Sequence, residues 1–96
     1  MIIFGKKLNL TQYKNYLLQS LAHKNPKVVS DTESYFSMNV QKDERNISIN
    51  LNNQTKGYII IDVIDPYAII RIPRTKISDF EKFREFCLNT INVNLI

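Results

Sequence analysis

The chain has 96 residues, and since one domain usually takes about 100–200 residues, we expect a single domain over residues 1–96. With 44% hydrophobic and 23% charged residues, the composition is that of a globular protein and excludes a disordered chain. One cysteine and one histidine exclude a disulfide framework and a cysteine-rich zinc site, and no apolar run approaches the roughly 20 residues of a membrane-spanning helix.

The formal net charge is +4, from 13 basic and 9 acidic residues, and it is unevenly distributed. Residues 1–30 contain five lysines, among them Lys6 and Lys7, and no acid, whereas the remaining residues contain 8 bases and 9 acids. This asymmetry of a basic protein favours a polyanion or an acidic protein surface as partner. An AT-rich genome, which raises the use of Ile, Asn and Lys, explains the same lysines without any partner.

Two features of the sequence predict a cytoplasmic protein. The segment Met1–Gly5 lacks the basic region and the long apolar core of a signal peptide. A single unpaired cysteine is typical of a reducing compartment.

The first part of the chain predicts a strand and a helix. Ile2–Phe4 is a short apolar run, and Asn9 with Gln12 three residues later is typical of a helix start. Pro26 ends this helix, because proline disfavours helical geometry at the residue before it. The apolar stripe consists of Leu10, Tyr13, Leu17, Leu18 and Leu21.

The middle of the chain predicts four strands rich in Ile, Tyr and Val, separated by short turns. They are Ser34–Gln41, Asn46–Leu51, Tyr58–Ile64 and Tyr67–Ile72. Consecutive strands joined by such turns form an antiparallel meander. Asp65-Pro66 is the expected two-residue turn of the last hairpin.

The end of the chain predicts a second helix. Ser78 and Glu81 form a capping box, and the helix carries an apolar stripe of Phe80, Phe83, Cys87 and Ile91. The order β-α-β-β-β-β-α therefore predicts an α+β fold: a single four- to five-stranded antiparallel meander sheet with an N-terminal and a C-terminal helix.

Strict alternation along strands sorts the predicted sheet into two faces. One face is wholly apolar and must be buried: Phe36, Met38, Val40, Ile47, Ile49, Leu51, Ile59, Ile61, Val63, Ala68, Ile70 and Ile72. The other face is mixed: Tyr35, Ser37, Asn39, Gln41, Asn46, Ser48, Asn50, Tyr58, Ile60, Asp62, Ile64, Tyr67, Ile69 and Arg71.

The mixed face predicts binding of single-stranded DNA or RNA, because unpaired bases stack on aromatic rings while amides and hydroxyls reach base edges. The candidate residues are Tyr35, Tyr58 and Tyr67 for stacking, and Arg71, Arg74, Lys76, Lys6 and Lys7 for the phosphates. Two alternatives stay open. The first helix covers this face, or the face is a protein–protein surface, either of a homo-oligomer or of an adaptor or enzyme inhibitor of the kind encoded by phages and mobile elements.

The segment from Tyr67 to Phe83, a strand ending in Ile72-Pro73 followed by a polar stretch and a helix start, resembles the last strand and helix of PUR repeats in Pur-alpha-like proteins. The same ββββ-α order is found in Whirly proteins, and the resemblance covers residues 35–91. It implies single-stranded nucleic-acid binding and a homodimer. The first strand and helix lie outside the pattern, and acidic Asp62 on the predicted binding face departs from it.

The sequence predicts no enzyme, because residues for catalysis are not grouped. His23 is expected at the surface, and Cys87, on an apolar stripe, is expected to be a buried inert thiol. Asp62 is expected to pair with Arg71 across the last hairpin. No cluster has metal-ligand spacing, so neither a metal nor a cofactor is predicted.

Overall fold

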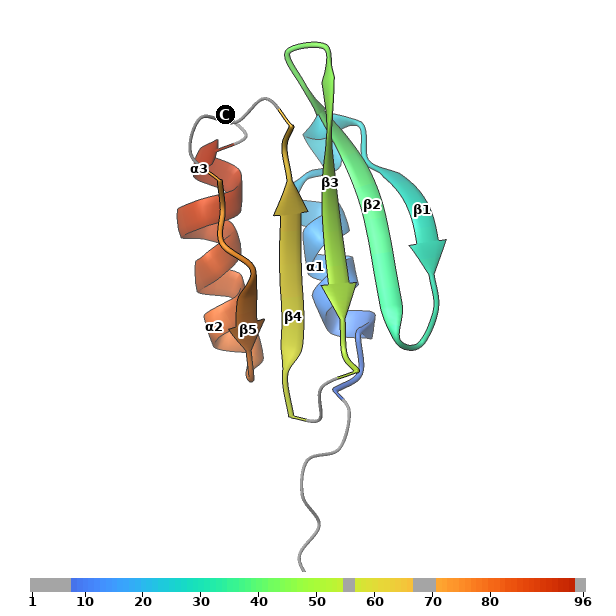
Figure 1. Ribbon diagram of the computed structural model, residues 1–96, viewed down its shortest axis with the longest axis vertical. Coiled ribbons are helices and arrows are strands. Elements are labelled where there is room, and N and C mark those ends of the chain that lie inside the picture. Colours follow the sequence, from blue (N-terminus) through green and yellow to red (C-terminus); the bar gives the residue numbers. More distant parts are fainter. Residues whose placement is uncertain (1–7, 55–56, 67–70, 95–96) are drawn as a thin grey trace, which may run out of the picture.

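A five-stranded antiparallel sheet forms one layer of the protein (Figure 1). The structure is a computed structural model that describes residues 8–54, 57–66 and 71–94. The strands are β1 (Lys27–Asp31), β2 (Tyr35–Lys42), β3 (Arg45–Asn52), β4 (Ile59–Ile64) and β5 (Thr75–Ile77). Each strand pairs with the next along the chain, so the predicted α+β fold with a meander sheet is confirmed.

The helices flank the strands in sequence: α1 (Thr11–Ser20) ends in a short 3-10 turn, Ala22–Lys24. The C-terminal helix consists of α2 (Phe80–Phe86), a π-helical stretch Cys87–Ile91 and α3 (Asn92–Asn94). No helix within the described residues has the length and apolar character needed to cross a membrane.

The two helix starts differ in their caps. The N-cap position of α1 is Leu10, which makes no side-chain capping bond, rather than the predicted Asn9; Asn9 Oδ1 accepts from the Thr11 amide at 2.8 Å just before the helix. At α2 the cap is Asp79, whose carboxylate accepts from the Lys82 amide at 2.9 Å, so the prediction of Ser78 as the cap is wrong by one residue. Asp79 satisfies an orphan amide of the first turn and adds a negative charge at the positive end of the helix.

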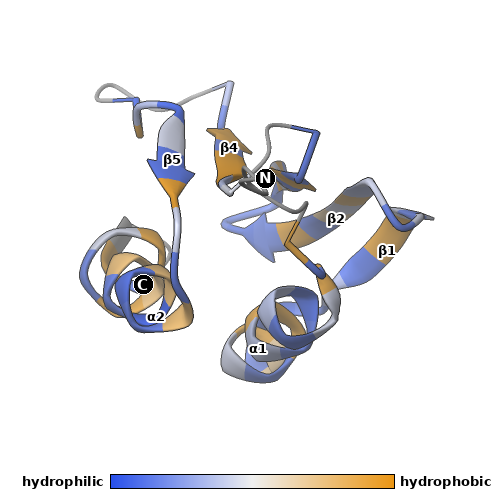
Figure 2. Ribbon diagram, turned by 90° about the horizontal axis from the view of Figure 1, so that it is seen from below, coloured by the Kyte–Doolittle hydropathy of each residue, from blue (hydrophilic) through white to orange (hydrophobic). Residues whose placement is uncertain are grey.

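Both helices pack on the same face of the sheet (Figure 2). The core contains the apolar residues predicted for β2, β3 and β4, all buried, together with the stripes of the two helices. Its members are Leu10, Tyr13, Leu17, Leu21, Phe36, Met38, Val40, Ile47, Ile49, Leu51, Ile59, Ile61, Val63, Ile77, Phe83, Cys87 and Ile91. Ile72 is partly buried against them, while Ala68 and Ile70 lie outside the described residues.

The helices touch through aromatic rings. Tyr13 meets Phe83 edge to face, with ring centroids 5.0 Å apart, and Tyr16 meets Phe80 in the same way at 5.7 Å. Such pairs contribute about 0.5–1.5 kcal/mol beyond the area they bury. The two helices therefore form one continuous layer beneath the sheet.

The two edge strands differ from those predicted. β1 was not expected, and the strand expected at Ile2–Phe4 lies outside the described residues. The strand expected at Tyr67–Ile72 is wrong for Arg71 and Ile72, which lie in no strand; the fifth strand is β5, which pairs Thr75 with Ile61. This register needs a ten-residue connection after β4 rather than a two-residue turn, and Pro73, which has no N–H, falls within that connection.

Asn53, at the end of β3, joins three segments of the chain. It is only 4% exposed, and its Nδ2 donates to the carbonyl oxygens of Leu8 at 2.6 Å and Glu33 at 2.9 Å. These bonds tie the segment leading into α1 to the turn between β1 and β2. Both need an amide donor, since a carbonyl oxygen only accepts.

We therefore expect Asn53→Asp to lower the free energy of unfolding by about 2 kcal/mol or more, because it loses both bonds and places a carboxylate against two carbonyl oxygens. Asn52→Asp is the matched control: there the oxygen alone is used, accepting from the Gln54 amide at 2.8 Å. Urea unfolding of both variants measures the difference, and equal losses would contradict the assigned role of Asn53.

The lone thiol lies in the core, as predicted: Cys87 is fully buried. Burial raises its pKa from the ordinary value of 9.0 to about 12. The folded state thus retains a proton that the unfolded chain releases above pH 9. The stability linked to this proton is complete below pH 9 and is lost as the pH rises towards 12.

We expect Cys87 to react very slowly with a disulfide reagent such as DTNB at pH 8 in the folded protein, because the thiolate is the reactive form. In guanidinium chloride the same thiol should react at the rate of a free cysteine. Absorbance of the released thiolate follows both reactions. Rapid stoichiometric modification of the folded protein would contradict the inert assignment.

Candidate nucleic-acid interface

The face of the sheet opposite the helices, here named the open face, is covered by neither α1 nor α2 (Figure 2). Cross-strand registers place its members, since paired residues share a face. They are Lys27, Ser30, Tyr35, Ser37, Asn39, Gln41, Asn46, Ser48, Asn50, Asn52, Ile60, Asp62, Ile64 and Lys76. The alternative in which the first helix covers the tyrosines is therefore wrong.

A hydrogen-bond cluster occupies the centre of the open face. Asn50 Oδ1 accepts from Tyr35 Oη at 3.0 Å, from Ser37 Oγ at 2.6 Å and, more weakly, from Ser48 Oγ at 3.4 Å. Three hydroxyls thus converge on one oxygen, which orients the Asn50 amide and restrains the Tyr35 ring. Tyr35 remains 37% exposed, so its ring is held but still accessible.

A second aromatic group lies at the start of β4. Tyr58 is 43% exposed, and Lys76 Nζ lies 5.8 Å from its ring centroid, within the range of a cation–π contact. Lys76 also belongs to a cross-strand row that runs through Ile60 and Asn52 to Tyr35. Three strand spacings of about 4.8 Å separate the ends of this row, roughly 14 Å.

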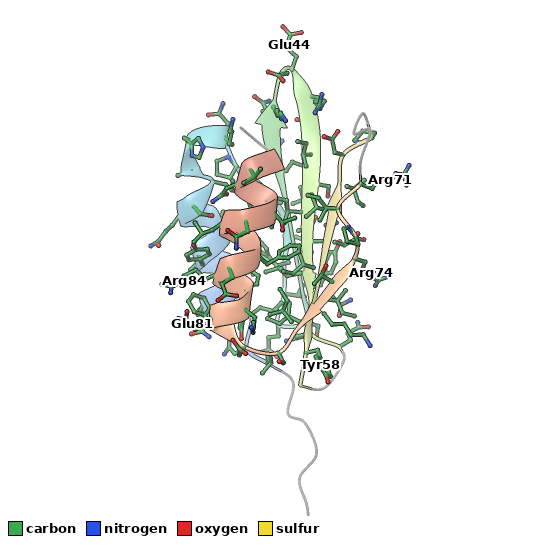
Figure 3. All side chains as sticks on the ribbon, turned by 90° about the vertical axis from the view of Figure 1, so that its left-hand side faces the viewer. Glu44, Tyr58, Arg71, Arg74, Glu81 and Arg84 are labelled. Carbon is green, nitrogen blue, oxygen red and sulfur yellow. The ribbon has the colours of Figure 1, made fainter. Side chains whose placement is uncertain are left out.

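The two arginines of the predicted site lie beside the open face. Arg71 and Arg74 are exposed residues of the segment leading into β5, and Figure 3 shows both on the side of the sheet away from the helices. Arg84 projects on the helix side, where its guanidinium pairs with Glu81 at 2.8 Å. Arg71 and Arg74 make no ion pair within the described part of the chain.

The predicted ion pair between Asp62 and Arg71 is absent. It required Arg71 in a strand directly beside Asp62, whereas β5 begins only at Thr75. The cross-strand partner of Asp62 is Asn50. Asp65, three residues further along, does form an ion pair, with Arg45 at 3.0 Å.

The structure brings Tyr35, Tyr58 and Lys76 together on the open face, with Arg71 and Arg74 at its β5 side. Tyr67, Lys6 and Lys7, the remaining predicted site residues, lie outside the described residues. Sequence reasoning missed Lys27, which lies on the open face opposite Asn39. The missing signal was β1 itself, whose residues lack a clear alternation of apolar and polar side chains.

His23 is exposed, as predicted. Residues 8–54, 57–66 and 71–94 contain no group of His, Cys, Asp and Glu side chains that could hold a metal ion.

Comparison with known proteins gave no match to a family model, to a curated protein or to a solved structure. The resemblance to PUR repeats and Whirly proteins therefore stays a prediction.

Proposed function

We propose that this protein is a small non-enzymatic protein that binds single-stranded DNA or RNA through the open face. One observation carries the proposal: both helices pack on the opposite face, so the tyrosines and amides of the open face remain available to a ligand. A strand bound there places its bases over Tyr58, Tyr35 and the Asn50 cluster, and its phosphates along the β5 side.

Stacking supports this arrangement. Exposed aromatic rings offer a flat apolar surface on which any base can stack, and each stacked base contributes about 1–3 kcal/mol to the binding free energy. Tyr58 is 43% exposed, and the ammonium of Lys76, 5.8 Å from its ring centroid, contacts a phosphate of the nucleotide that stacks there. Neighbouring amides and hydroxyls on β2 and β3 supply hydrogen bonds to base edges.

The distribution of charge supports it as well. Arg71, Arg74 and Lys76 follow one another along a single side of the open face, and the two arginines are unpaired in the described structure. The other two arginines of the chain, Arg45 and Arg84, are paired with acids. Free cations on one face provide the electrostatic part of nucleic-acid affinity.

A protein partner is the second candidate, and one observation favours it. Ile64, on the open face, is 50% exposed, and Ile60 lies on the same face of β4, on the other side of Asp62. Exposed apolar side chains of this kind suit a second copy of the chain, as in a homodimer, or the surface of a larger protein. Sedimentation of the wild type and of Ile64→Asp distinguishes this function: a dimer that the substitution dissociates, in a protein without affinity for oligonucleotides, would favour it.

We expect Tyr58→Ala to weaken binding of a fluorescein-labelled ten-nucleotide single strand about tenfold, because one stacking platform is lost. Leu88→Ala is the control, since Leu88 is an exposed apolar residue, 50% accessible, on the helix layer. Fluorescence anisotropy at low salt measures both. No binding of any single strand by the wild type would overturn the proposed function.

We also expect replacement of Arg74 and Lys76 by glutamine to reduce the slope of log affinity against log salt concentration by about 1.4, since each phosphate contact to a single strand contributes about 0.7. Arg84→Gln removes a cation from the helix side and should leave the slope unchanged. A slope that falls equally in both variants would show that general charge, not the open face, attracts the strand.

A further inference from the structure

Asp62 is a carboxylate in the middle of the open face. It is partly buried, and it makes no hydrogen bond or ion pair within the described residues. On its own strand the neighbours on the same face are Ile60 and Ile64. A partly desolvated charge without a partner is unfavourable, and it also repels phosphates, so general attraction of a polyanion does not explain it.

The neighbour of Asp62 across the strands is Asn50, whose Cβ lies at the usual spacing of about 5 Å for directly opposed residues. The Asn50 oxygen is occupied by the hydroxyls of Tyr35 and Ser37. Its N–H₂ group takes no part in these bonds and remains able to donate. The centre of the open face thus presents one amide donor next to two carboxylate acceptors.

Among the bases of DNA and RNA, guanine has the complementary edge. A carboxylate only accepts hydrogen bonds, so it needs donors on the base. Guanine offers two adjacent donors, N1–H and N2–H₂, that one carboxylate can bind together, and its O6 accepts a hydrogen bond from an amide. Adenine and cytosine offer one amino group beside a ring acceptor. Thymine and uracil offer one N–H between two carbonyl oxygens.

We propose that Asp62 and Asn50 form a base-reading pair that selects guanine in a bound single strand, with Asp62 accepting from N1–H and N2–H₂ and Asn50 donating to O6. This inference rests on the proposed function and names the base that the open face recognises. Asp62 acts as a specificity residue. Its negative charge weakens the attraction of the open face for phosphates, but its carboxylate makes two charge-assisted hydrogen bonds to one base.

The test compares three labelled ten-nucleotide strands by fluorescence anisotropy: all thymidine, the same strand with one central guanosine, and the same strand with inosine at that position. A single guanosine avoids structures formed by guanine runs. We expect the guanosine strand to bind about tenfold more tightly than the thymidine strand, the discrimination typical of a bidentate contact. Inosine, which lacks the 2-amino group, should lose most of this gain without any change to the protein.

Asp62→Asn should abolish the preference for guanosine while binding the all-thymidine strand as tightly as the wild type or more so. Glu44→Gln is the matched control, because it removes one negative charge at the hairpin tip, at the opposite end of the molecule from Tyr58 (Figure 3). Equal binding of the three strands, or a preference that survives Asp62→Asn, would overturn this inference and leave the proposed function intact. Failure of every strand to bind overturns both.

Discussion

The contact between the two helices beneath one face of the sheet is the interaction on which the rest of the structure depends. Tyr13 and Phe83 meet at 5.0 Å, and the rings of Tyr16 and Phe80 extend this contact towards solvent. Because the helices are neighbours, their stripes bury a single apolar face of the sheet together. A helix on each face would instead have left no side of the sheet free for a ligand.

The open face is largely polar because the apolar side chains of β2, β3 and β4, except Ile60 and Ile64 on β4, lie on the face that the helices cover. Along β2 and β3 the side chains alternate between fully buried hydrocarbons, such as Ile49, and amides or hydroxyls, such as Asn50. The polar row is internally bonded through the Asn50 oxygen, which restrains Tyr35 without covering it. A surface of this kind loses little side-chain entropy when a ligand docks, because its groups are already positioned.

Most of the fold followed from periodicity. The alternation over Phe36–Val40 and Ile47–Leu51 predicted both the strands and the buried face, and short polar turns allowed only an antiparallel meander. The edges did not follow. Residues 67–72 are as apolar and β-branched as a strand, yet β5 begins at Thr75, because propensity does not encode where an edge strand pairs. β1 has no alternation to detect, since only one strand supports it and its side chains are largely exposed.

The candidate site, too, was predicted only in part from the sequence. Tyr35 and Tyr58 could be assigned to the open face from strand parity alone, because alternation is a local property of the backbone. Three features depend on cross-strand register: the convergence of three hydroxyls on Asn50, the lack of a partner for Asp62 among the described residues, and the position of Lys76 over Tyr58. By itself, then, the sequence determined the three central strands, the two helices, the apolar face and the net charge. Only the tertiary structure decided that α1 shares a face with α2 and leaves the tyrosines open, because an amphipathic helix records which of its sides is buried but not which side of a sheet it covers.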